Sequence, residues 1–271
     1  MPFFPMLKES DPRSGFLEPA SYAAPARECA RVGLWLRTMF EIGHSYGWRH
    51  GEVLGLRVRQ VDLLAGAIRL DVGSTKNNEG REVAMTQAVR ILLTECVRDK
   101  RPEEKVFTRL ARKKGGGVES RSVSDFRKTW ANACTAAGVG KLLCPTCEEP
   151  VDTKKHCAPC GKDWTRNKLK YEGLLFHDLR RTAVRNMVRA GVSEKVSMTI
   201  SDHKTRSVFE RYNIVAQSDL QDAARKLETS QKQGCEKNEN PLSPDFGQSL
   251  GTVAPKMGTE QMVPLLAPLP N

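Results

Sequence analysis

The fold of this chain is decided by the stretch GWRHGEVLGLR, residues 47–57, which combines an apolar helix pattern with one charged pair. Between Trp48 and Leu56 apolar residues recur at steps of three and four, which predicts a helix with one face in the core. Arg49 and Glu52 lie one turn apart on this otherwise apolar helix. A guanidinium held by Glu52 still has donors for a phosphate, although an ordinary structural ion pair has the same spacing.

The flanking segments add a second helix and a pair of strands. Upstream, Arg31–Phe40 repeats the three- and four-residue pattern of a core-facing helix. Downstream, AIRLDV (67–72) and REVAMT (81–86) alternate as strands do, and the Asn-Asn-Glu-Gly run between them has turn chemistry. These features predict a β-hairpin with Lys76 at its shoulder. Lys76 is there either a solvated turn residue or a mobile cation that reaches a ligand.

Helical patterns continue through much of the remaining chain. They cover residues 88–99, 122–138, 177–191, 192–201 and 219–228. Ser122 and Ser124 are the candidate N-caps of the second of these helices, and residues 109–121 are predicted to be a basic, Gly-rich loop. The sequence therefore predicts an α+β fold, mainly helical, with a small β-sheet or hairpin.

The charge balance favours a polyanionic partner. The chain has 43 Lys and Arg against 32 Asp and Glu, a net charge of +11. A basic surface suggests a nucleic-acid partner but does not establish one, because charge bears on partners and not on fold. The alternative is a basic domain that binds no nucleic acid. No run approaches the roughly 20 apolar residues of a membrane span, and the N-terminus lacks a secretory signal pattern. We therefore expect a cytoplasmic protein without a membrane partner.

Four of the eight cysteines form two CxxC pairs separated by nine residues. They are Cys144, Cys147, Cys157 and Cys160. This pattern favours reduced thiols and a metal site over a disulfide framework, because four thiolates can close a tetrahedral zinc site. We predict one structural Zn²⁺, with four unligated thiols, or His156 in place of one thiol, as alternatives. Residues 141–166 accordingly look like an insertion that resembles a zinc ribbon.

Further polar residues complete a set that suits one reaction. His177 and Arg180 are three residues apart in HDLR, and His203 stands nine residues ahead of Tyr212 in SDHKTRSVFERY. Each of these residues has an ordinary structural explanation when taken alone. A single tyrosine, for example, is usually a packed aromatic. Together with the arginine and lysine named above, they suit in-line attack of a tyrosine hydroxyl on a phosphodiester.

The chemistry of that attack requires each of these residue types. The non-bridging phosphate oxygens gain charge in the transition state, which two arginines and a histidine can stabilise without a metal ion. A tyrosine hydroxyl ordinarily has a pKa near 10 and needs a neighbouring base, for which histidine is the natural candidate. The leaving 5′-oxygen needs a proton, which a lysine on a flexible hairpin can deliver.

Over residues 28–225 the order and spacing of these motifs resemble the catalytic domain of the tyrosine recombinase, or phage integrase, family. GWRHGEVLGLR, STKNNEGREV, HDLRRT and DHKTRSVFERY carry the resemblance. It implies a site-specific recombinase that cleaves and rejoins double-stranded DNA through a 3′-phosphotyrosyl intermediate, without a catalytic cofactor, as a tetramer on two DNA sites. It assigns phosphate binding to Arg49, Arg180 and His203, proton transfer to His177, general acid catalysis to Lys76, orientation of the site to Glu52 and nucleophilic attack to Tyr212.

Two features depart from the family pattern. Asp202 stands where members commonly have Gly, which tolerates left-handed backbone without steric cost. Its carboxylate would repel the phosphate beside His203 unless it faces solvent. Residues 1–27 are predicted to be an irregular lead-in without a complete core-binding domain, which leaves a truncated product or an accessory DNA-binding protein as alternatives. Residues 229–271 are predicted to be a disordered tail.

Two other functions remain open at the level of sequence. The first is a non-enzymatic DNA-binding remnant, which keeps the basic surface and the zinc ribbon but does not cleave DNA. A type IB topoisomerase shares the phosphotyrosyl chemistry, but the segment NIVAQSDLQDAARKL (213–227) after the tyrosine is more similar to that of the integrases.

Overall fold

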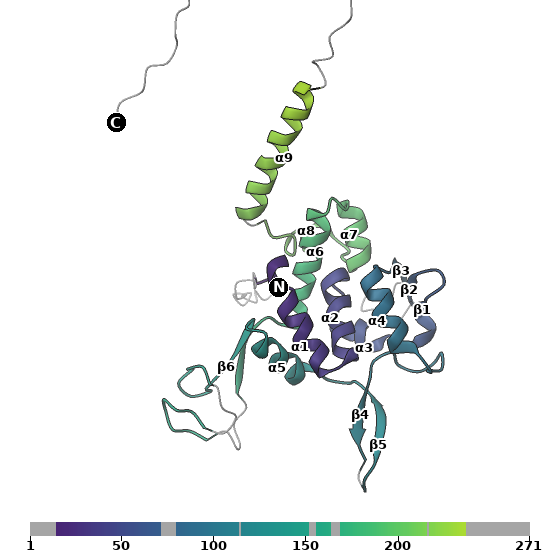
Figure 1. Ribbon diagram of the computed structural model, residues 1–271, viewed down its shortest axis with the longest axis vertical. Coiled ribbons are helices and arrows are strands. Elements are labelled where there is room, and N and C mark those ends of the chain that lie inside the picture. Colours follow the sequence, from purple (N-terminus) through teal and green to yellow (C-terminus); the bar gives the residue numbers. More distant parts are fainter. Residues whose placement is uncertain are drawn as a thin grey trace, which may run out of the picture. The chain divides into compact units, whose positions relative to one another are not determined.

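The computed structural model describes residues 15–71, 80–113, 115–151, 156–163, 169–215 and 217–236 (Figure 1). Its α-helices are α1 (Ala23–Val32), α2 (Leu34–Tyr46), α3 (His50–Gly55), α4 (Gln87–Val97), α5 (Arg127–Ala136), α6 (Leu179–Arg189), α7 (Glu194–Ser201), α8 (Arg206–Glu210) and α9 (Gln217–Glu236). Short 3₁₀ turns are η1 (Pro19–Ser21), η2 (Val58–Gln60) and η3 (Phe176–Asp178). The strands are β1 (Val61–Asp62), β2 (Ala67–Leu70), β3 (Arg81–Ala84), β4 (Thr108–Arg112), β5 (Val118–Ser122), β6 (Gly140–Leu143) and β7 (Lys170–Gly173). The predicted α+β, mainly helical fold is confirmed.

Helix α2 forms the centre of the core because its sequence, LWLRTMFEIGHSY, is apolar on most of its circumference. Leu36, Met39, Phe40 and Ile42 on this helix are fully buried. Helices α1, α4 and α6 all pack against it. The first part of the chain and the segment after residue 176 therefore meet around one helix.

The three small sheets are all antiparallel. Strands β1, β2 and β3 form one sheet in that order, with Ile68 opposite Val83. The hairpin predicted from residues 67–72 and 81–86 is thus confirmed, and its turn, with Lys76, lies outside the described residues. Strands β4 and β5 form a second pair, and β6 and β7 a third.

Two predictions between residues 108 and 138 are wrong. The segment expected to be a loop is the β4–β5 hairpin, which can reverse within a few residues because Gly115, Gly116 and Gly117 all have positive φ. Helix α5 begins only at Arg127, with Phe126 at the N-cap position. The serines expected as caps therefore precede the helix. The Asp125 carboxylate instead accepts from the Arg127 backbone N–H at 2.9 Å, and Phe126 is buried against Phe176, at 5.1 Å between ring centroids.

The chain divides into two compact units at residues Leu220 and Gln221. Inside the range expected to be irregular, η1 begins at Pro19 and α1 at Ala23. Helix α9 continues past residue 229, where the disordered tail was expected, and ends at Glu236, while residues 237–271 lie outside the described ones. Among the described residues, no helix has the length and apolar character needed to cross a membrane.

Two glycines of the α2 region allow helix α6 and the turn before it to approach closely. A Cβ on Gly43 would lie 2.8 Å from Leu179 Cδ1, a distance that real side chains do not show. Gly47 ends α2 with φ 66°, and a Cβ there would lie 3.1 Å from the Cα of Arg180. The backbone that leads into Arg49 therefore lies directly against the helix that carries Arg180.

Candidate active site

Arg49 lies at the N-cap of helix α3, where the GWRHGEV sequence turns from α2 into the next helix. Glu52, three residues on, accepts from the Arg49 backbone N–H at 2.8 Å and from its guanidinium Nη1 at 3.2 Å. The Glu52 side chain is only 3% exposed, whereas that of Arg49 is 27% exposed. The predicted pair is present: the Arg49 side chain is partly exposed, and the Glu52 carboxylate is buried.

Arg180 is held by three acceptors that come from two distant parts of the chain. Its Nη1 donates to the Gly47 carbonyl at 2.7 Å, its Nε to His203 Nε2 at 3.1 Å, and its Nη2 to the Asp202 carbonyl at 3.3 Å. The residue is 2% exposed. Since a guanidinium has five N–H donors, two remain after these contacts.

His203 is fixed in one tautomer by its neighbours. Because Nε2 accepts from Arg180, the ring proton is on Nδ1, which donates to Ser201 Oγ at 2.7 Å. Ser201 in turn donates to the Ser197 carbonyl at 2.6 Å. The chain of contacts orients His203 as a support for the Arg180 guanidinium.

Tyr212 follows helix α8 and lies beside both histidines. Its hydroxyl is 3.2 Å from His177 Nε2, and its ring centroid is 4.7 Å from that of His203. The Arg180 guanidinium carbon lies 5.5 Å from the centre of the Tyr212 ring. The tyrosine hydroxyl thus has an imidazole within hydrogen-bonding distance and a guanidinium alongside.

These side chains meet at one pocket of about 230 Å³. Its lining consists of Arg49, His177, Arg180, Asp202, His203, Lys204, Thr205, Val208 and Tyr212. The structure therefore brings together five of the six predicted catalytic residues, with the predicted supporting residue Glu52 directly behind Arg49. The sixth, Lys76, lies outside the described residues.

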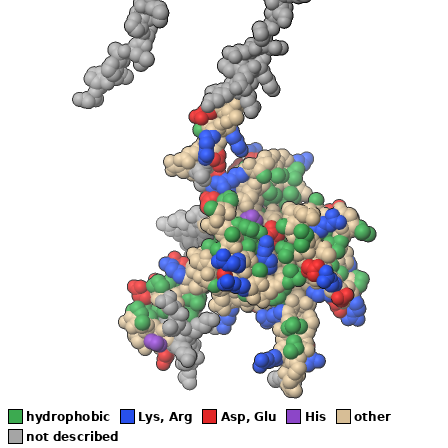
Figure 2. All heavy atoms as spheres, in the orientation of Figure 1, with side chains coloured by type: hydrophobic (Ala, Val, Ile, Leu, Met, Phe, Trp, Pro, Cys, Tyr) green, Lys and Arg blue, Asp and Glu red, His purple; other side chains and the backbone are tan. Residues whose placement is uncertain are grey.

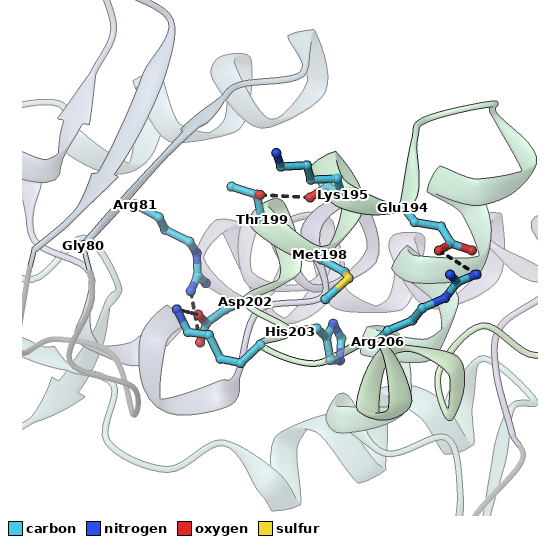
Figure 3. A pocket seen from close by; sticks show the side chains of 10 residues that line it. Gly80, Arg81, Glu194, Lys195, Met198, Thr199, Asp202, His203 and Arg206 are labelled. Atoms are coloured by element: carbon cyan, nitrogen blue, oxygen red, sulfur yellow. Dashed lines mark hydrogen bonds and ion pairs between the residues drawn. The ribbon is translucent and has the colours of Figure 1, made fainter.

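Asp202 is not solvent-facing, which decides between the two alternatives left by the sequence. It ends helix α7 in the left-handed conformation, with φ 58° and ψ 47°, as a glycine would. Its side chain is 5% exposed. The carboxylate forms a close ion pair with Arg49 Nη1. It also lies 3.5 Å from Arg81 Nη1 (Figure 3).

Arg81 is a residue of this cluster that sequence reasoning missed. It lies on β3, and its side chain is 6% exposed. Its Nη2 donates to Glu52 Oε2 at 3.0 Å, and its guanidinium carbon lies 5.2 Å from the Trp48 ring centre. A signal was present: residues two apart on a strand share a face, so Arg81 had to point the same way as the buried Val83.

Both histidines are neutral at physiological pH. Burial, followed by the charges of Arg180 and Arg49, lowers the pKa of His203 to about 3. Desolvation, followed by the charges of Arg180 and Arg181, also lowers the pKa of His177. A neutral His177 can accept the hydroxyl proton of Tyr212 through Nε2.

The depressed pKa of His203 predicts acid sensitivity. As the pH falls below about 6.5, the unfolded chain binds a proton at this residue while the folded protein does not. The free energy of unfolding should therefore decrease between roughly pH 6.5 and 3, by up to about 1.4 kcal/mol per pH unit. Urea unfolding at several pH values measures how the free energy of unfolding changes with pH. This change should be smaller in His203→Gln than in the wild type. If that variant and the exposed-residue control His50→Gln have the same slope as the wild type, His203 is not the titrating group.

The four cysteines of the insertion also meet in space. Their sulfur atoms all lie within 4.8 Å of one another, and the separations Cys144–Cys160 and Cys147–Cys157 are 3.5 Å. Tetrahedral zinc with bonds of about 2.3 Å would place sulfurs about 3.8 Å apart, whereas a disulfide bond would place them about 2.05 Å apart. The donor set fits a metal ion and not a pair of disulfides.

The two CxxC turns have the same backbone hydrogen bonds. Cys144 N–H donates to the Glu149 carbonyl at 2.9 Å, and Cys157 N–H to the Lys162 carbonyl at 2.8 Å. Each turn has a residue of positive φ directly after its second cysteine, Glu148 and Gly161. The turns are therefore two equivalent knuckles, and β6 and β7 pair at the base of the insertion.

Comparison with known proteins identifies the fold. Residues 19–145 match the model of the phage integrase family. Among solved structures, XerA recombinase is 16% identical with a TM-score of 0.55, and the similarity covers 81% of this chain and 66% of that one. The Tn1549 transposon integrase in complex with transposon right end DNA is 14% identical with a TM-score of 0.52, over 82% and 68% of the two chains. A search of curated proteins gives no significant match.

The fold is thus that of the catalytic domain of tyrosine recombinases. More particularly, residues 19–145 match the phage integrase family model, and this match confirms the resemblance inferred from the motifs. The chain spans about two thirds of the length of the XerA structure. The family match includes Arg49 and Glu52 but ends before His177, so the second half of the candidate site rests on geometry and motif order.

Proposed function

We propose that the chain is a site-specific tyrosine recombinase that cleaves and rejoins double-stranded DNA through a 3′-phosphotyrosyl intermediate. The observation that carries this proposal is the meeting of Arg49, Arg180, His203, His177 and Tyr212 at one pocket. The family domain and the recombinase structures of similar fold support the same class of function. The Tn1549 integrase structure is described as a complex with DNA, which makes DNA the proposed partner here.

In the proposed cleavage step the Tyr212 oxygen forms a bond to phosphorus while the bond from phosphorus to the 5′-oxygen breaks. The tyrosine proton passes to His177 Nε2, 3.2 Å away. Lys76 supplies the proton that the 5′-oxygen needs. The 5′-hydroxyl of a partner strand then attacks the phosphotyrosyl bond and releases the enzyme, so the bond energy is conserved and no nucleotide cofactor is consumed.

The cationic residues have distinct proposed roles. Arg49 and the two remaining donors of Arg180 bind the non-bridging oxygens, where charge grows in the transition state. Glu52 orients Arg49, and His203 supports Arg180. To bind the phosphate, His203 gives up the Arg180 bond and carries its proton on Nε2, while Ser201 donates to Nδ1. Because these side chains supply the positive charge, the proposal assigns no catalytic cofactor.

Exposed basic residues outside the pocket support a DNA partner. Arg109, Arg112 and Arg121 lie exposed on the β4–β5 hairpin, and Figure 2 shows Lys and Arg side chains along this projection. Lysines and arginines in such positions neutralise backbone phosphates without reading sequence. The proposal includes a tetramer on two DNA sites, an accessory DNA-binding protein as partner, and a cytoplasmic location on DNA.

One experiment tests the proposed function directly. Nicked suicide substrates made from the DNA that flanks the gene trap a covalent intermediate, which denaturing gels detect. We expect an adduct whose peptide map places the DNA on Tyr212. Binding without any adduct across these substrates would instead favour the non-enzymatic DNA-binding remnant, which the Asp202–Arg49 ion pair makes the second candidate.

We also propose that Cys144, Cys147, Cys157 and Cys160 hold one structural Zn²⁺. All four thiolates are required to close the tetrahedral site, and so small a segment has few apolar side chains with which to fold. The metal would order the two knuckles and take no part in phosphoryl transfer.

The zinc proposal predicts a defined stoichiometry. Purified wild type should contain about one Zn²⁺ per chain, and a Cys144→Ser, Cys157→Ser double variant should contain close to none. Proteolysis within residues 141–173 should become faster in the double variant. Cys96→Ala, which removes a buried thiol elsewhere, is the control and should retain the metal. Wild type with no zinc after expression in zinc-supplemented medium would contradict the proposal.

A further inference from the structure

Asp202 belongs to a closed ring of charges at the base of the pocket. Its carboxylate pairs with Arg49 and, at 3.5 Å, with Arg81, while Glu52 contacts the same two arginines at 3.2 and 3.0 Å. The four residues come from α3, β3 and the end of α7. Two guanidiniums and two carboxylates therefore alternate, and each arginine already has two anionic partners.

The carboxylate also has a third cation beside it. Lys204 Nζ lies 3.7 Å from Asp202 Oδ1, and Figure 3 shows Asp202 beside Arg81. Asp202 can consequently lose its contact with Arg49 and still be paired. After that contact is lost, pairing with Arg81 and Lys204 offsets the desolvation cost of the buried Asp202 carboxylate.

Arg49 is the member of the ring that a phosphate needs. It lines the pocket together with Arg180 and Tyr212, and so does Asp202. A phosphate bound between Arg49 and Arg180 would lie close to the Asp202 carboxylate. The two anions would then share the donors of the Arg49 guanidinium. Like charges in a poorly solvated site disfavour one another strongly.

We propose that Asp202 is an internal anion that occupies Arg49 in the empty site, so that a phosphate binds only by displacing it. Displacement leaves Asp202 on Arg81 and Lys204, and leaves Glu52 to orient Arg49. Asp202 thereby sets the phosphate affinity of the pocket. The glycine expected at this position has no side chain with which to do so. The part of the inference that concerns DNA cleavage rests on the proposed function, and the part that concerns phosphate binding does not.

The backbone allows the idea to be tested without rearranging the loop. Asp202 has φ 58°, a conformation that Asn and Gly adopt readily. Asp202→Asn removes the charge and keeps an oxygen that can accept from Arg49, and Asp202→Gly removes the whole side chain. Glu194→Gln is the matched control, because it removes one carboxylate at the start of α7, where Glu194 pairs with Arg206 at 3.4 Å and lies outside the pocket that Arg49 and Tyr212 line.

The first measurement is the Kd for inorganic phosphate, by calorimetry at constant ionic strength. We expect Asp202→Asn and Asp202→Gly to bind phosphate about tenfold more tightly than wild type, and Glu194→Gln to differ by less than about twofold. Adding Arg49→Gln to Asp202→Asn should abolish the gain. A folded Asp202→Asn protein with unchanged or weaker phosphate binding would overturn the inference, as would a gain that persists without Arg49.

The second measurement separates this inference from the proposed function. Covalent adduct formation on the nicked substrates should be faster in Asp202→Asn by a similar factor. If phosphate affinity rises while neither protein forms an adduct, the internal anion stands and the recombinase proposal fails. If adduct forms in wild type and phosphate affinity does not rise in the variant, the recombinase proposal stands and the internal anion is rejected.

Discussion

Replacing Tyr212 by phenylalanine is expected to reduce covalent attachment of DNA by at least roughly a thousandfold. The variant loses the only atom that can form the phosphotyrosyl bond in the proposed mechanism. It keeps the ring that packs 4.7 Å from His203 and lies beside the Arg180 guanidinium. The loss should therefore reflect chemistry, and the affinity for the same DNA should stay within about twofold of wild type.

The measurement is single-turnover adduct formation on a nicked duplex, with DNA binding followed separately by gel shift. Tyr171→Phe is the matched control, because Tyr171 is a half-buried tyrosine whose hydroxyl donates to the Leu174 carbonyl, at 2.9 Å, and does not line the pocket. That variant should form adduct at the wild-type rate. An adduct that persists in Tyr212→Phe would mean that another side chain is the nucleophile.

Replacing Arg180 by lysine is expected to lower the rate of cleavage by a factor on the order of 100 to 1,000. Burial, and then the charge of Arg49, lower the pKa of Arg180 to about 10, so the residue stays charged at neutral pH. Lysine preserves a charge but has three donors at a single point. It cannot hold Gly47 and His203 and also present two donors to a phosphate.

The same single-turnover assay measures this effect. Arg189→Lys provides the comparison, because Arg189 is on the same helix and pairs with Glu18 and Asp219 instead of lining the pocket. Its cleavage rate should remain within about threefold of wild type. An Arg180→Lys protein that cleaves as fast as Arg189→Lys would remove Arg180 from the proposed mechanism.

The sequence was sufficient for those parts of the site that depend on local spacing. Arg49 and Glu52 lie one turn apart and pair as expected. The alternation of residues 67–72 and 81–86 was enough for the β2–β3 hairpin. The CxxC spacing was enough to place four sulfurs together. Each of these arrangements is fixed by neighbours within a few turns of the chain.

The features that the sequence did not predict involve contacts between segments that are distant in the sequence. Asp202 and Arg49 are 153 residues apart in sequence, so nothing local shows that the carboxylate lies buried against that guanidinium. Phe126, at the start of α5, packs against Phe176, which is distant in the sequence. Tertiary packing overrides local capping and turn preferences at such positions.

The pairing of β6 with β7 has a consequence for how the site assembles during folding. Gly47 and Arg180 are 133 residues apart, and the entropy lost on closing such a loop increases with its length. Strand pairing brings Leu143 opposite Lys170, so the chain enters and leaves the cysteine module at nearly one point. If the module folds first around the proposed zinc, the loop that the two halves of the pocket must close is shorter by roughly a fifth, which lowers its closure cost by only about 0.2 kcal/mol. Removal of the proposed metal should therefore leave the assembly of the pocket almost unchanged.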